Sequence, residues 1–142
     1  DSINIIVGNE KNRDILSSKF QNYSLNWYGQ VNANKVAKLM FESDICISAG
    51  GQTLHELAFI GVPTICIETG KDQTLNISGY IESGFLIEKL TLFSNQLSQK
   101  ISFLLDKYSD DKLRKVISEK GKTITKGQGA SRIVSVIAEQ HT

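Results

Sequence analysis

A glycine pair, Gly50 and Gly51, separates a strand-like run from a helix-like run in the segment SAGGQTLHE, residues 48–56. Glycines let a backbone approach a phosphate without a Cβ in the way. The N–H groups and the dipole at a helix N-terminus attract anions. In open α/β sheets the ligand crevice lies at the carboxyl ends of the strands, which is where this segment falls. These residues could therefore bind the phosphates of a nucleotide.

The same segment also has a purely structural interpretation. Thr53 followed by Glu56 matches the T-x-x-E capping box, in which each side chain satisfies a backbone N–H of the first helical turn. The two glycines would then only turn the chain. Because the segment is neither a Walker loop nor GxGxxG, local physics alone favours the turn and leaves phosphate binding open.

The elements that position this segment follow from the hydrophobic pattern. Short β-rich runs alternate with longer helical patterns, which is typical of βα units that build a parallel sheet. We expect strands at residues 3–8, 24–29, 44–50, 64–68 and 85–90, with helices at 9–20, 33–43, 53–61 and 74–84. Residues 93–142 are expected to be mostly helical. The predicted fold is α/β and Rossmann-like, a three-layer α/β/α arrangement with a mostly parallel sheet of about five or six strands.

Composition limits the classes of function. The 142 residues are enough for a single domain, and 16 Lys and Arg against 15 Asp and Glu give no global field for nucleic acid. Cys46 and Cys66 each lie in an apolar run, so we expect buried thiols, a reducing cytoplasmic setting and no metal site. No run is long enough to span a membrane. The chain begins with Asp1 directly before a strand, so we expect a single domain, residues 1–142, excised from a longer two-domain protein.

Several motifs in order carry a family resemblance. The segment SDICISAGGQTLHELAFIGVPTICIETGKDQTLN, residues 43–76, resembles the C-terminal nucleotide-binding half of GT-B-fold enzymes that handle UDP-sugars. Its T-x-x-E, G-x-P, Gln and Asn are similar to the lipid II N-acetylglucosaminyltransferase family. The GG-x-T turn and the late KGQGASRI, residues 126–133, are more similar to the pseudaminic-acid pathway UDP-sugar hydrolase and its spore-coat polysaccharide biosynthesis relatives. The resemblance covers roughly residues 31–137.

The resemblance implies a set of binding residues in this chain. Glu56 would hold the ribose hydroxyls, because a carboxylate accepts from both vicinal donors. Gln73 and Asn76 would face the sugar or the distal phosphate, and Val31 and Asn32 would lie in the loop at the uracil edge. The residues expected against the diphosphate are Gly50, Gly51, Gln52 and Thr53.

No catalytic group is expected in this domain. Neither histidine, His55 or His141, has the setting of a catalytic base, and we expect a packing or surface role for His55. The resemblance implies that the catalytic histidine belongs to an N-terminal GT-B domain, in the same chain or in a separate subunit. It implies no cofactor, with UDP or a UDP-sugar as product or substrate. The chain would be the UDP-sugar-binding domain of a hydrolase; the alternatives are the donor-binding domain of a GT-B glycosyltransferase and a non-catalytic nucleotide-binding or partner subunit.

Overall fold

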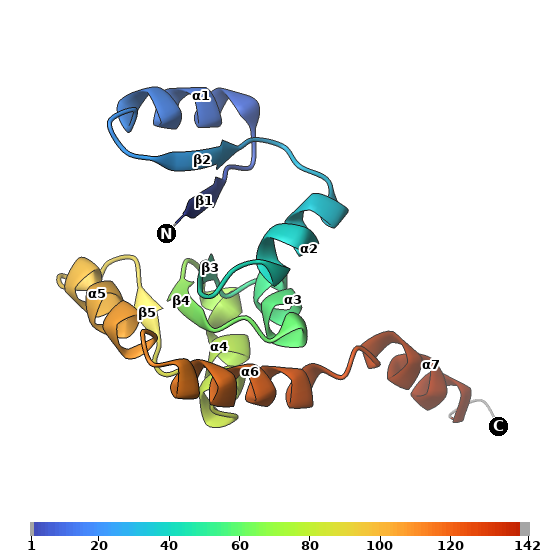
Figure 1. Ribbon diagram of the computed structural model, residues 1–142. Coiled ribbons are helices and arrows are strands. Elements are labelled where there is room, and N and C mark those ends of the chain that lie inside the picture. Colours follow the sequence, from blue (N-terminus) through green and yellow to red (C-terminus); the bar gives the residue numbers. More distant parts are fainter. Residues whose placement is uncertain (1, 140–142) are drawn as a thin grey trace. The chain divides into compact units, whose positions relative to one another are not determined.

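The computed structural model describes residues 2–139 and divides the chain into two units, between Glu42 and Ser43 (Figure 1). The first unit is a β–α–β–α segment, in which β1 and β2 pair in parallel. Its elements are β1 (Ile3–Ile6), α1 (Glu10–Lys19), β2 (Leu25–Tyr28) and α2 (Ala33–Phe41). The Glu10 carboxylate accepts a hydrogen bond from the Gln30 amide at 2.9 Å, so the start of α1 is tied to the loop after β2.

The second unit contains a three-stranded parallel sheet in the order β3, β4, β5. Helices follow each strand, as the alternating pattern predicts. Its elements are β3 (Cys46–Ala49), α3 (Gln52–Ile60), β4 (Thr64–Glu68), the 3₁₀ helix η1 (Lys71–Gln73), α4 (Thr74–Glu82), β5 (Leu90–Thr91), α5 (Leu97–Lys107), α6 (Asp111–Thr125) and α7 (Gly129–Glu139).

The core of the second unit is formed by residues of β4, β5, α3, α4, α5 and α6. Thr64, Ile65 and Cys66 of β4 are buried in succession, as expected for a strand covered on both faces. Helix α6 packs closely on α3, and a Cβ on Gly121 would lie 2.7 Å from the Ala58 carbonyl oxygen. Glycine at this position therefore allows the two helices to approach one another.

Most of the predicted elements are confirmed within a residue or two. The helix predicted at 53–61 ends at Gly61, whose φ of 84° is the left-handed conformation that favours glycine. The Gly61 amide bonds the carbonyls of Leu57 and Ala58, which closes the helix.

The strand predicted at residues 85–90 is wrong, since β5 begins only at Leu90. The amides of Phe85 and Leu86 both donate to the Tyr80 carbonyl at 3.0 Å, after Gly84 turns the chain with φ of 80°. These two residues therefore fold back onto the end of α4. Their apolar character reflects burial, with exposed fractions of 0% and 3%, and not strand pairing.

The mixed α/β class is confirmed, with parallel pairing of strands in both units. The described residues form five strands in a two-stranded and a three-stranded sheet, where the sequence predicts a single sheet of about five or six strands. Among these same residues, no helix combines the length and the apolar character that crossing a membrane would require.

Candidate functional site at the carboxyl ends of β3 and β4

The turn between β3 and α3 leaves backbone donors free. Gly51 is the residue that precedes the helix, in an extended conformation with φ of −85° and ψ of −152°, and no side chain among the described residues caps the helix. The Leu54 amide bonds the Gly51 carbonyl at 3.1 Å. Within residues 2–139 the amides of Gly51, Gln52 and Thr53 have no hydrogen-bond acceptor. Three consecutive N–H groups at a helix N-terminus are thus available to water or to an anion.

The capping box predicted from Thr53 and Glu56 is wrong. The helix begins at Gln52, so Thr53 is its second residue and not the residue that precedes it. Neither the Thr53 hydroxyl nor the Glu56 carboxylate bonds any group in the described part of the chain, and both side chains are exposed. The reason is the extended Gly51, which starts the helix two residues earlier than the T-x-x-E pattern requires.

The two glycines of the turn have different environments. Gly50 is buried, and a Cβ there would lie 2.6 Å from both Cγ1 and Cδ1 of the buried Ile77. A Cβ on Gly51 would meet no atom within 4 Å. Packing against α4 therefore explains glycine at position 50, whereas Gly51 faces open space that a ligand could occupy.

Gln73 connects this turn to the loop after β4. Its Oε1 accepts hydrogen bonds from the amides of Gly50 at 3.2 Å and Thr69 at 3.0 Å, and its Nε2 donates to the Thr69 hydroxyl at 2.9 Å. Asn76, three residues further along, is exposed in the first turn of α4. The structure therefore gives Gln73 a defined set of protein partners and leaves the Asn76 side chain at the surface.

Val31 and Asn32, predicted at the uracil edge, belong to the first unit. The Asn32 side chain caps α2, since its Oδ1 accepts a hydrogen bond from the Lys35 amide at 2.9 Å. Val31 is half-buried. Their predicted contact with a base stays a prediction.

The motif KGQGASRI lies at the junction of α6 and α7. Lys126 and Gly127 both have positive φ, 37° and 62°, and so end α6. A Cβ on Gly127 would lie 2.9 Å from the Phe59 ring of α3. Close packing against α3 is thus one physical reason for glycine in this motif.

A charged cluster at the carboxyl end of β4 was missed from the sequence. The Thr74 hydroxyl donates to the Glu68 carboxylate, and the Lys89 Nζ lies 3.1 Å from it. These contacts hold the pKa of Glu68 below its ordinary value, with the Thr74 hydrogen bond as the largest cause. These contacts therefore favour the ionised form of the Glu68 carboxylate. The sequence signal that could have indicated this cluster was the position of Glu68 as the last residue of the strand predicted at 64–68.

His55 contacts the core of the second unit. Its Nδ1 lies 2.7 Å from the Tyr80 hydroxyl, and the two rings are 5.5 Å apart and tilted. Burial raises the pKa of the Tyr80 phenol. His55 thus joins α3 to α4 through a hydrogen bond; His141 lies outside the described residues.

Both cysteines are free thiols; Cys66 is buried, as the sequence predicts, whereas Cys46 is half-buried. Burial raises the pKa of the Cys46 and Cys66 thiols to about 11, so almost no thiolate is present at neutral pH. In the part of the chain that the structure describes, His, Cys, Asp and Glu side chains do not gather in threes that could hold a metal ion.

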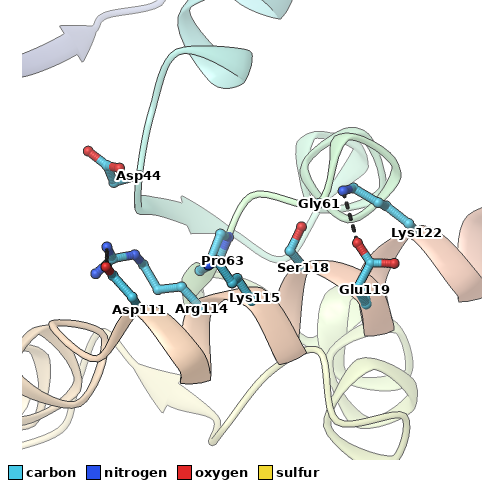
Figure 2. Close-up of a pocket in the computed structure, with 9 residues that line it drawn as sticks. All are labelled: Asp44, Gly61, Pro63, Asp111, Arg114, Lys115, Ser118, Glu119 and Lys122. Carbon is cyan, nitrogen blue, oxygen red and sulfur yellow. Dashed lines mark hydrogen bonds and ion pairs between the residues drawn. The ribbon is translucent and has the colours of Figure 1, made fainter.

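A cavity of about 400 Å³ lies at the opposite edge of the sheet, before β3 and β4 (Figure 2). The Glu119 carboxylate pairs with Lys122 at 3.2 Å, and the Asp111 carboxylate pairs with Arg114. The lining carries three cationic and three acidic side chains and therefore has no excess charge to select a ligand. The residues that line it are Asp44, Gly61, Pro63, Asp111, Arg114, Lys115, Ser118, Glu119 and Lys122.

Comparison of the chain with protein-family models, with curated proteins and with solved structures finds no match.

Proposed function

We propose that the second unit binds the diphosphate of a UDP-sugar at the N-terminus of α3. The observation that carries this proposal is the set of three amides, on Gly51, Gln52 and Thr53, that have no acceptor among residues 2–139, with open space where a Cβ on Gly51 would lie. A diphosphate could approach these donors directly, and the positive end of the α3 dipole favours its charge. This turn also lies at the carboxyl end of a parallel strand, where such folds bind their ligands.

The identity of the nucleotide rests on the family resemblance of the sequence. On that basis Glu56 would accept hydrogen bonds from the ribose hydroxyls, and Asn76 would face the sugar. Glu56 is one turn after Thr53 on the same exposed part of α3, and its carboxylate is not engaged by any described residue. The side chains of Thr53 and Glu56 are thus both accessible from the solvent side of α3.

In this proposal the chain is the nucleotide-binding half of a UDP-sugar hydrolase. Its fold would be the Rossmann-like three-layer fold that forms the C-terminal half of a GT-B enzyme. In the reaction, water attacks the anomeric carbon of the sugar and UDP departs with the glycosidic oxygen. The amides of the turn would stabilise the negative charge that develops on the departing diphosphate. The base that activates the water is proposed to belong to the N-terminal domain, so the 142-residue chain alone should bind UDP without hydrolysing UDP-sugars.

A titration of the ¹⁵N-labelled chain with UDP, UMP, ADP and inorganic diphosphate tests this proposal. We expect UDP to shift the amide resonances of Gly51, Gln52 and Thr53 more than other resonances of the second unit. Inorganic diphosphate should shift the same amides, because they contact only the phosphates. If these amides do not respond to millimolar UDP, the proposal is wrong.

The Glu56→Gln variant tests the ribose assignment. It should weaken UDP binding and leave the binding of inorganic diphosphate unchanged, because the carboxylate is assigned to the sugar hydroxyls. An unchanged UDP affinity would remove Glu56 from the site.

A further inference from the structure

We infer that Gln73 is a positioning residue for the turn proposed to bind the diphosphate, residues 50–53, and that it does not contact the sugar. Its side-chain carbonyl holds the backbone of the turn in place, so that the free amides that follow are ordered before the ligand arrives. This inference rests on the proposed function and gives Gln73 a role different from the sugar or phosphate contact that the family resemblance implies.

The hydrogen bonds of the Gln73 side chain carry the inference. Its Oε1 is the acceptor for the Gly50 amide at 3.2 Å, and no other acceptor for that amide occurs in the described part of the chain. The same oxygen accepts from the Thr69 amide at 3.0 Å. Because both partners are backbone N–H donors, only the oxygen of the side-chain amide can face them, and this fixes the orientation of the amide.

The position of Gly50 explains why this contact should matter for binding. Gly50 directly precedes these three amides; its N–H is bonded to Gln73, and Ile77 fills the space where a Cβ on Gly50 would lie. Without the Gln73 carbonyl, the Gly50 amide would lose its partner in a buried site, which favours other backbone conformations. The turn would then have to be ordered at the moment of binding, and that ordering lowers affinity.

The same contact couples two loops. Thr69 follows β4, and Gly50 follows β3, so a single side chain joins the carboxyl ends of neighbouring strands. Gln73 itself lies at the junction of η1 and α4, where its backbone is held within helical structure. The link is thus anchored on a rigid element, which suits a residue that positions others.

The two roles of Gln73 predict different ligand dependence. A contact with the sugar would affect the binding of UDP-N-acetylglucosamine and leave UDP and inorganic diphosphate unchanged. A positioning role would affect all three ligands by a similar factor, because the diphosphate amides serve each of them. The protection of the Gly50 amide in the ligand-free protein would also fall.

The test compares Gln73→Met and Gln73→Glu with the wild-type chain. Methionine has a similar length and no strong acceptor, whereas the glutamate carboxylate can accept both backbone N–H donors. We expect Gln73→Met to increase hydrogen exchange of the Gly50 amide by roughly 3- to 10-fold and to weaken UDP and inorganic diphosphate by a similar factor, as for the loss of one hydrogen bond. Gln73→Glu should restore protection of Gly50. Gln99→Met, the same substitution at an exposed position of α5, is the matched control and should leave that protection unchanged.

The outcomes separate this inference from the proposed function. If the wild-type chain binds neither UDP nor diphosphate, the proposed function fails, and the inference fails with it. If the wild type binds but Gln73→Met changes only UDP-N-acetylglucosamine, Gln73 contacts the sugar and the positioning role is wrong. Unchanged exchange of the Gly50 amide in Gln73→Met would overturn the inference in the same way, whatever the affinities.

Discussion

Replacing the two neighbouring glycines of the turn should change stability in opposite directions. Gly51 precedes α3 in an extended conformation, has no side chain to cap the helix and has open space around its Cα. Serine is a preferred residue at this position, and its backbone can adopt the same conformation. In Gly51→Ser, the cap contributes a few tenths of a kcal/mol, and the reduced freedom of the unfolded chain adds about 0.4–1 kcal/mol. We expect a gain of about 0.5–1 kcal/mol in the free energy of unfolding.

Gly50→Ala should have the opposite effect. The new Cβ would lie 2.6 Å from two carbon atoms of Ile77, whose side chain is fully buried. Overpacking of this kind typically costs about 1–3 kcal/mol, and the reduced freedom of the unfolded chain offsets only part of it. The melting temperature should fall for Gly50→Ala and rise by about 2–5 °C for Gly51→Ser.

Ligand binding provides the second half of the test. A serine hydroxyl at position 51 would accept a hydrogen bond from the Thr53 amide, and its Cβ would occupy the space left for the diphosphate. Gly51→Ser should therefore bind UDP roughly 10-fold or more weakly, while it is the more stable protein. Thermal unfolding followed by circular dichroism and calorimetric titration with UDP measure the two quantities. A Gly51→Ser variant that binds UDP as the wild type does would refute phosphate binding at this turn, and an undiminished stability of Gly50→Ala would refute the packing argument.

Three further predictions concern other side chains of the second unit. The pKa of Glu68 is lowered in the folded state, so its ionised carboxylate stabilises the protein above pH 4.5. This contribution is lost as the pH falls from 4.5 through the lower folded-state pKa. The difference in melting temperature between the wild type and Glu68→Gln should therefore shrink between pH 7 and pH 3. His55→Phe and Tyr80→Phe should each lower the free energy of unfolding by about 1 kcal/mol, and a double-mutant cycle should show that the two effects are not additive. Tyr108→Phe should cost about 1 kcal/mol in chemical denaturation, because it removes a buried hydrogen bond of 3.0 Å to the Thr64 carbonyl.

Hydrophobic pattern and glycine position predicted much of the fold. The helix that ends at Gly61 follows from its apolar spacing and from the glycine that closes it. The same reasoning failed at Phe85 and Leu86, because an apolar run can be buried against a helix end as well as within a sheet. Sequence periodicity cannot separate the two cases over only a few residues.

The contacts within the site were beyond local sequence reasoning for a different reason. Gly50 and Gln73 are 23 residues apart, and the bond between them depends on how β3, β4 and η1 pack together. The pair of Glu68 and Lys89 depends in the same way on the pairing of β4 with β5. The family resemblance implied a ligand contact for Gln73, whereas the tertiary structure gives its carbonyl two backbone donors.

The position at which α3 begins resolves the two competing roles that the sequence allowed for Glu56. From the sequence, Glu56 could bond either the helix N-terminus, as a capping residue, or a ribose, as the family resemblance implies, but could not fully serve both. In the structure, Gly51 precedes the helix and the Glu56 carboxylate caps nothing among the described residues. Anion binding would use backbone donors, and ribose binding would use a side chain that the fold does not need. Glu56→Gln should therefore change UDP affinity with no change in the free energy of unfolding, and a loss of stability in that variant would contradict the observed start of the helix.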